Sequence, residues 1–301
     1  MPVIPMLAGP TASGKSDAAL RLAERHGLEV VTADAMQVYA GMDIGTAKPT
    51  AAERARVPHH LLDVVTPAEP FSVADYVRVA EAAIAEVLAR GRLPLVAGGT
   101  GFYLRALREG LPTVPPADPS VQAPLWDAVE QGRLPELIAE LAAAAPADAE
   151  RAAGNPRRVV RSLEVLRRTG RPPSAFAPLP PRYRYDLLVL MPDAATLRAR
   201  IAGRARRMFD SGLVEEVAAL LRAYPEQPTA LQAIGYKEVA AHLRGESSLE
   251  EAQAAVELAT QRYAKRQRTW FRAERGARFV PKVGEEAAAE LDAWIAGTLR
   301  G

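Results

Sequence analysis

The sequence of 301 residues contains no cysteine. Disulfide bonds, thiolate metal sites and cysteine nucleophiles are therefore excluded. No apolar run approaches the roughly 20 residues that a membrane-spanning helix needs, and the first six residues lack the basic stretch and apolar run of a signal peptide. Charge of neither sign dominates, because 38 Lys and Arg residues face 36 Asp and Glu residues. We therefore expect a soluble cytoplasmic protein, and the net charge decides nothing about its partners.

Hydrophobic residues make up 49% of the chain, which is typical of a globular protein with a sizeable core. A prior of about 150 residues per domain suggests two structural units. Four short apolar runs predict buried strands: 3–8, 28–32, 93–97 and 186–191. Helical spacing of apolar residues at 15–25 and 73–88 separates these strands. Alternating strands and helices predict an α/β fold, a parallel sheet with helices on both faces.

The pattern changes after Gly110. A proline-rich stretch comes first, an alanine-rich stretch without strand signals follows, and prolines cluster again before residue 182. We interpret residues 113–176 as an all-helical insertion domain, and residues 1–112 with 177–301 as a discontinuous core domain. Helical patterns dominate again from 194 to 273.

The strongest motif follows the first predicted strand and matches the P-loop pattern G-x-x-x-x-G-K-[ST]. Its residues are Gly9, Pro10, Thr11, Ala12, Ser13, Gly14, Lys15 and Ser16. In such a loop backbone N–H groups surround phosphate oxygens at a helix N-terminus. Lys15 is expected to reach the terminal phosphates and the Ser16 hydroxyl to bind Mg²⁺. The motif therefore predicts that the α/β fold is of the P-loop NTPase type and that it binds a diphosphate or triphosphate ligand, ATP among them.

The loop alone does not identify the reaction. A P-loop kinase or nucleotide hydrolase commonly carries an acidic residue after an apolar strand to hold Mg²⁺. Asp34 or Asp193 fits that role by position. Ligands in parallel sheets bind at the carboxyl ends of strands, and Gly9, Asp34 and Thr100 each follow such an end.

Seven further motifs narrow the choice. They are Ala33–Tyr39, Gly41–Pro49, Pro58–Asp63, Gly98–Tyr103, Asn155–Arg161, Gln232–Glu238 and Lys265–Phe271. Together with the P-loop, and in this order, they resemble the bacterial tRNA dimethylallyltransferases, also called tRNA isopentenyltransferases. The resemblance covers nearly the whole chain.

The resemblance implies a prenyl transfer to tRNA. Its donor is dimethylallyl diphosphate, assisted by Mg²⁺. Its acceptor is the exocyclic N6 amine of the adenosine 3′-adjacent to the anticodon, in tRNAs that read codons beginning with U. The P-loop then holds the diphosphate leaving group, and the adenosine is flipped out of its loop to meet the donor. Members of this family are regarded as monomers.

The resemblance also implies catalytic roles for three residues. Asp34 matches the family's catalytic aspartate, and as a general base it would contribute roughly 10²–10⁴-fold. Thr100 matches a threonine beside the reacting groups, although a bare threonine after Gly-Gly is also a plausible helix cap. Arg200, Arg204 and Arg207 share one predicted helix face, and Arg204 matches the diphosphate-binding arginine. Cations there would stabilise charge on the leaving group, although such a face is more often only solvated.

Residues predicted to contact tRNA follow from the same resemblance. They are Asp34, Ala35, Met36, Gln37, Thr100, Gln122, Arg157, Arg158, Val159, Val160, Arg161, Gln232, Ala233, Ile234, Gly235, Tyr236 and Lys237. Gln122 departs from the family, in which a cation often stands there. Cations and aromatic side chains also alternate between Gln261 and Arg275, as a surface that tracks phosphates and stacks bases requires, or as a solvated basic helix with an aromatic core face would show.

Three alternative functions remain from the residues. A small-molecule kinase would use the same P-loop, a prenyltransferase acting on free adenine nucleotides would not need the tRNA surface, and a non-catalytic RNA-binding protein would not need Asp34 beside Lys15. His59 and His60 invite a metal site, but adjacent histidines do not easily face one ion.

Overall fold

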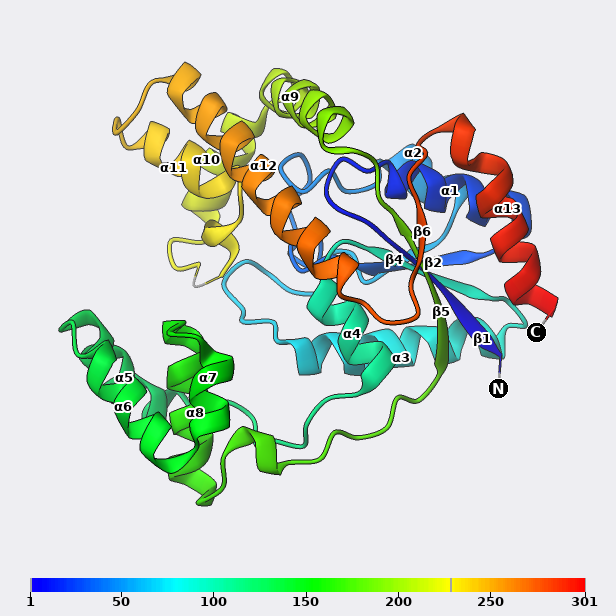
Figure 1. Cartoon of the computed structure of the whole chain (residues 1–301). Helices are drawn as coiled ribbons and strands as arrows, with labels where there is room; N and C mark the ends of the chain where they lie inside the picture. Colours follow the sequence, from blue (N-terminus) through cyan, green and yellow to red (C-terminus); the bar gives the residue numbers. More distant parts are fainter. Residues whose placement is uncertain (1, 228, 301) are drawn as a thin grey trace. The chain divides into compact units, whose positions relative to one another are not determined.

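The computed structural model describes residues 2–227 and 229–300 (Figure 1). They form two compact units. One comprises the residues up to Arg108 together with those from Arg182 on, and the other comprises Glu109–Pro181. No helix among the described residues is both long enough and apolar enough to cross a bilayer.

The first unit is built on a six-stranded sheet. Its strands are β1 (Val3–Ala8), β2 (Glu29–Ala33), β3 (His59–His60), β4 (Pro94–Gly98), β5 (Arg184–Leu190) and β6 (Arg278–Val280). Their order is β3-β2-β4-β1-β5-β6, and all pairs are parallel. The four predicted strands are confirmed, whereas β3 and β6 were not predicted. The strands β1, β2 and β4 are adjacent, so their carboxyl ends meet at one edge.

Helices cover both faces of the sheet, as predicted. On one face α3 (Val73–Ala89) and α4 (Gly101–Glu109) pack against alternate strand residues such as Met6 and Val96. On the other face α1 (Lys15–His26) and α13 (Glu285–Arg300) pack against the intervening residues such as Leu7 and Leu95. This two-sided burial explains why the central strands are apolar throughout.

The remaining helices of the first unit confirm the predicted helical region. They are α2 (Ala51–Arg56), α9 (Ala194–Asp210), α10 (Leu213–Ala223), η2 (Ala230–Gln232), α11 (Tyr236–Leu243) and α12 (Leu249–Arg272). The long segment after β2 does not join a sheet. Instead Val38, Tyr39 and Met42 from this segment are buried against α10 and α11. The segment after β2 and the helices α10 and α11 therefore share one hydrophobic cluster.

The second unit is all-helical, as predicted for the insertion. It contains α5 (Pro119–Glu130), α6 (Leu134–Ala144), α7 (Pro146–Ala152), α8 (Pro156–Thr169) and η1 (Pro173–Ala175). Helix α8 begins as its sequence indicated, because the Asn155 side chain accepts a hydrogen bond from the N–H of Arg158 and Pro156 occupies the first turn. Leu125, Leu141 and Leu163 lie in a hydrophobic core of the unit's own.

Candidate active site

The P-loop joins β1 to α1 with the backbone geometry of a phosphate cradle. Gly14 has φ 85° and precedes the first residue of α1, which glycine alone adopts without strain. A side chain at Gly9 would come within 2.6 Å of the Ser13 hydroxyl and 2.7 Å of the Leu190 carbonyl. The two glycines therefore permit a tight loop directly before the N-terminus of α1, and a helix N-terminus favours a bound phosphate.

Lys15 lies between this loop and an acidic neighbour. Burial lowers the pKa of its ammonium to about 8; the nearby charge of Asp34 opposes this shift and that of Arg204 adds to it. Its Nζ donates to the carbonyl of Pro10 at 3.4 Å. An anion bound in the cradle would favour the charged form of Lys15.

Two of the three arginines predicted on one face of α9 approach the P-loop region. The Arg200 guanidinium packs on Gly14, where an added Cβ would lie 3.0 Å from its Nη2 atom. Arg204 donates to the carbonyl of Thr46 at 3.4 Å, and burial lowers its pKa while Asp34 opposes that shift. Arg207 is exposed. The structure thus brings Arg200 and Arg204, but not the exposed Arg207, towards the P-loop.

Asp34 and Thr100 lie together after the neighbouring strands β2 and β4. The Asp34 Oδ1 accepts hydrogen bonds from the backbone N–H groups of Met36, at 2.9 Å, and Gln37, at 3.4 Å. No other hydrogen bond to this carboxylate occurs within residues 2–227 and 229–300, so Oδ2 has no hydrogen-bond partner among them. The Thr100 hydroxyl oxygen accepts from the N–H of Ala35 at 3.0 Å.

Gln267 on α12 lies within the motif Lys265–Phe271, but no separate role was predicted for it. Its Oε1 accepts from the N–H of Thr11 at 2.8 Å, and its Nε2 donates to the carbonyl of Gly99 at 2.7 Å. The side chain is only 6% exposed. It thus fixes the P-loop to the end of β4. A Cβ at Gly99 would lie 2.7 Å from this amide, and one at Gly101 would collide with Trp270, so both glycines allow α12 to approach.

The carboxyl-terminal half of α12 forms a basic and aromatic surface. An open cavity of about 500 Å³ is lined by Arg105, Lys265, Arg266, Thr269, Trp270 and Ala273. The Arg105 guanidinium lies 4.0 Å from the centre of the Trp270 ring. Burial raises the pKa of Tyr263, and the nearby charge of Asp34 adds to that shift. The surface therefore reaches the residues at the ends of β2 and β4.

The predicted tRNA-contacting residues in the first unit differ in exposure. Gln37 is 8% exposed, and its Nε2 donates to the carbonyls of Thr46, at 3.1 Å, and Ala47, at 3.3 Å. In the stretch 232–237, Gln232 and Lys237 are exposed, whereas Ala233, Gly235 and Tyr236 are buried and Ile234 is half-buried. The buried residues among them support the surface from below. Only the exposed and half-buried residues can touch a ligand with their side chains.

The predicted tRNA-contacting residues of the second unit also differ in exposure. Arg157 and Arg158 are exposed, but Val159 and Val160 lie in the hydrophobic core of the unit. The Arg161 guanidinium is bound internally, to Glu164 at 2.7 Å and to the carbonyl of Pro115.

Gln122, the neutral side chain predicted to contact tRNA, donates to the same buried Glu164 at 2.7 Å. A neutral amide at this position therefore supports a carboxylate already bound by Arg161 and, at 3.1 Å, by Arg168. Glu164 itself is fully buried, and no feature of the sequence indicated its role.

Asp193 and the adjacent histidines His59 and His60, considered above as metal ligands, make contacts within the protein. Asp193 is the N-cap of α9 and accepts from the N–H groups of Ala195, at 2.7 Å, and Thr196, at 2.9 Å. His60 binds the Glu29 carboxylate at 2.7 Å, whereas His59 binds the carbonyl of Val57 at 2.8 Å. The two histidines thus engage different partners. The described residues contain no group of three or more His, Asp or Glu side chains placed to hold a metal ion.

Two family models match the chain. One described as IPP transferase matches residues 37–274, and one described as isopentenyl transferase matches residues 2–63. A tRNA dimethylallyltransferase of Thermus thermophilus is 58% identical over 98% of both chains. Another, of Deinococcus radiodurans, is 51% identical over 95% of both.

Solved structures agree with these matches. A tRNA isopentenylpyrophosphate transferase from Bacillus halodurans is 36% identical with a TM-score of 0.74, covering 100% of this chain and 97% of its own. A eukaryotic dimethylallyltransferase described as acting on tRNA is 27% identical with a TM-score of 0.75, covering 90% of this chain and 70% of its own.

Proposed function

The chain belongs to the IPP transferase family, that of the tRNA dimethylallyltransferases, and we propose from this premise a specific reaction. The enzyme is a transferase that modifies tRNA. The proposed donor is dimethylallyl diphosphate. The proposed acceptor is the N6 amine of the adenosine 3′-adjacent to the anticodon, in tRNAs that read codons beginning with U. One observation carries the proposal: a P-loop and an available carboxylate oxygen of Asp34 lie at the same edge of the sheet.

The P-loop side of the site suits a diphosphate leaving group. Lys15, Arg200 and Arg204 approach the loop from two helices, and each would stabilise negative charge that grows as the allylic C–O bond breaks. A Mg²⁺ ion would neutralise further charge on the diphosphate. The exposed Ser16 hydroxyl at the start of α1 would supply one oxygen ligand, and diphosphate and water would supply the others.

Asp34 would act on the acceptor. The adenine amine is a weak nucleophile, because its lone pair is delocalised into the ring. As the nitrogen bonds to C1 of the donor, the C1–O bond breaks and diphosphate leaves with the electron pair. The amine proton passes to Asp34 Oδ2, while the N–H groups of Met36 and Gln37 hold Oδ1 in place. The Thr100 hydroxyl, bound to Ala35, would lie beside the reacting groups.

The RNA side would use both compact units. We propose that the α12 surface and the exposed Gln232 and Lys237 contact the anticodon stem-loop from the first unit, and that Arg157 and Arg158 do so from the second. Unpaired loop bases can be splayed and stacked on aromatic side chains, as the exposed cavity beside Trp270 would allow. We propose that the enzyme works as a monomer in the cytoplasm, where its substrate occurs.

The test is transfer of labelled dimethylallyl diphosphate to unmodified tRNA in the presence of Mg²⁺, with AMP and ATP as parallel acceptors. Label in the tRNA alone is expected. Label in AMP or ATP alone would move the enzyme to the class acting on free nucleotides. Consumption of ATP with a small acceptor, and no label anywhere, would support a kinase instead.

A further inference from the structure

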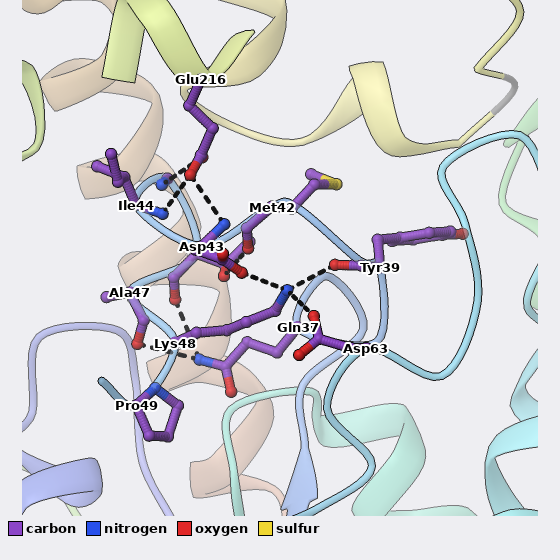
Figure 2. A network of polar contacts seen from close by, with 12 residues as sticks. Gln37, Tyr39, Met42, Asp43, Ile44, Ala47, Lys48, Pro49, Asp63 and Glu216 are labelled. Atoms are coloured by element: carbon purple, nitrogen blue, oxygen red, sulfur yellow. Dashed lines mark hydrogen bonds and ion pairs between the residues drawn. The ribbon is translucent and has the colours of Figure 1, made fainter. Parts of the chain in front are cut away.

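The loop that carries Asp34 and Gln37 continues to Pro49 and is held by two charged side chains (Figure 2). One of them, Glu216, comes from the first turn of α10, far away in the sequence. Its Oε2 accepts from the N–H groups of Asp43, at 3.0 Å, and Ile44, at 2.7 Å. Its Oε1 accepts from the N–H of Gly45 at 3.2 Å. Three consecutive backbone donors therefore converge on one carboxylate, an arrangement that binds anions.

The same carboxylate also reaches α11. Glu216 Oε1 accepts from the Tyr236 hydroxyl at 2.6 Å, and Tyr236 is only 2% exposed. The Tyr236 ring packs directly on Gly45, where an added Cβ would lie 2.6 Å from the ring carbon Cζ. Glu216 and the Tyr236 ring thus join the loop to the first residue of α11, within the stretch 232–237.

The second charged side chain, Lys48, binds two residues of the loop and Asp63 beyond it. The Lys48 Nζ donates to the carbonyl of Tyr39 at 2.6 Å, to Asp43 at 2.7 Å and to Asp63 at 2.6 Å (Figure 2). The Lys48 side chain is 1% exposed. A buried ammonium with three acceptors is satisfied, and loss of any one acceptor would leave buried charge poorly paired.

The loop also contacts Gln37, near Asp34, and Arg204. The carbonyl of Thr46 accepts from Gln37 at 3.1 Å and from Arg204 at 3.4 Å. The N–H of Gln37 in turn donates to Asp34. A shift of the backbone between Asp43 and Thr46 would therefore move both the Asp34–Gln37 turn and a partner of Arg204.

We propose that Glu216 is a positioning residue for tRNA: it holds the Asp34–Lys48 loop and the start of α11 in one preformed arrangement, so that two segments that contact tRNA are presented together. This inference rests on the proposed function. Glu216 need not touch the substrate itself. Because Glu216 orders the loop in the free enzyme, tRNA binding costs less conformational entropy.

The experiment compares Glu216→Gln with Glu215→Gln. Both residues lie in the first turn of α10, so both variants lose one negative charge near the same helix N-terminus, but Glu215 is exposed. A glutamine at 216 turns an NH2 group towards backbone donors. We expect the KM for tRNA to rise about tenfold in E216Q. The affinity for inorganic diphosphate should change much less, because the loop reaches Arg204 through a long hydrogen bond, 3.4 Å, to the Thr46 carbonyl. E215Q should match the wild type in both measurements.

Hydrogen exchange supplies a readout that does not depend on activity. Peptides containing residues 43–45 should exchange faster in E216Q than in E215Q, whereas P-loop peptides should not change. Equal exchange and an equal KM for tRNA in the two variants would overturn the inference. An equal loss of tRNA and diphosphate binding would also overturn it, because that pattern indicates general destabilisation.

Tyr236→Phe keeps the inference testable if E216Q does not fold. This variant removes one of the four donors to Glu216 and keeps the aromatic ring. A rise of about two- to threefold in the KM for tRNA is expected, and an unchanged value would contradict the inference. If instead the wild-type enzyme transfers no label to tRNA, the proposed function fails, whereas the exchange comparison still tests whether Glu216 orders the loop.

Discussion

Each compact unit contains a glutamate at the centre of residues predicted to contact tRNA, and the two glutamates bind different kinds of partner. Glu216 in the first unit accepts three backbone N–H groups and a tyrosine hydroxyl, so it fixes the main chain and consumes no cation. Glu164 in the second unit accepts from the side chains of Arg161, Arg168 and Gln122 and from the N–H of Asp118. It therefore binds two cations, one of which, Arg161, was predicted to contact tRNA.

The difference shows that residue type alone does not identify an RNA contact. An arginine whose guanidinium already serves an internal carboxylate contributes less to a phosphate than one left in solvent. In the proposed role of Glu216, a carboxylate conversely assists RNA binding without touching RNA, by ordering a backbone segment that does. Variants can therefore separate charged side chains that are paired within the protein from those that stay free to bind substrate.

The largest effect is expected at Asp34, in the loop that Glu216 holds. Asp34→Ala should reduce turnover by roughly 10²–10⁴-fold, because no base then takes the amine proton. Binding of tRNA should persist, since Glu216 and Lys48 still hold the loop. The measurement is single-turnover transfer beside a tRNA binding titration. Parallel loss of binding and turnover would refute the assignment of Asp34 as base.

The second effect concerns stability of the helical unit. Although burial opposes the shift, hydrogen bonds from Gln122 and Arg161 hold the pKa of Glu164 below its ordinary value. Glu164→Gln should destabilise the unit by about 1–3 kcal/mol, measured by urea unfolding.

The exposed Glu140, paired with Arg167, supplies the control, and Glu140→Gln should cost at most about 1 kcal/mol. The native pKa of Glu164 is depressed, so its contribution is present above the unfolded pKa of about 4.3. It is lost as the pH falls through the lower native value. The gap between wild type and E164Q should therefore close in acid, and a gap independent of pH would contradict the assigned cause.

The third effect is a pH dependence of the donor site. Because burial lowers the pKa of Lys15 to about 8, the free enzyme loses this positive charge as the pH rises through that value. Affinity for dimethylallyl diphosphate should be constant below pH 8 and should weaken above it, approaching tenfold per pH unit. Lys15→Arg should remove this dependence. A wild-type profile that stays flat to pH 9 would exclude Lys15 as a diphosphate ligand.

The smallest effect separates two arginines of one helix. Arg157 is exposed, and its side chain makes no hydrogen bond within residues 2–227 and 229–300. Arg157→Ala should weaken tRNA binding a few-fold and lower the slope of log affinity against log salt by about 1. Arg161→Ala should lower that slope less and destabilise the unit more. Equal slopes in the two variants would remove the distinction between internal and free charge.

Much of the fold followed from local pattern. Each of the four predicted strands is five to seven residues long in the structure, and the strand ends led correctly to the adjacency of Asp34 and Thr100. The strands β3 and β6 have two and three residues, too few to show a pattern. Membership of the transferase family was also correctly predicted from the motifs.

The supporting residues could not be predicted in the same way. Glu216 meets its backbone partners 171 to 173 residues away, and Gln267 meets Thr11 256 residues away. Polar side chains buried by such contacts look like surface residues in a sequence. The motif Lys265–Phe271 contains Gln267, but no feature of the sequence indicated that Lys48 and Glu164 are buried or that Glu216 binds the backbone of a distant loop.

The most direct test of the central claim changes a single acceptor group. An anticodon stem-loop that carries adenosine next to the anticodon is compared with one that carries purine riboside there, which lacks only the exocyclic amine. Label from dimethylallyl diphosphate should enter the first, and the second should bind with similar affinity but gain no label. Equal labelling of both would contradict transfer to N6, and labelling of neither would contradict the proposed reaction.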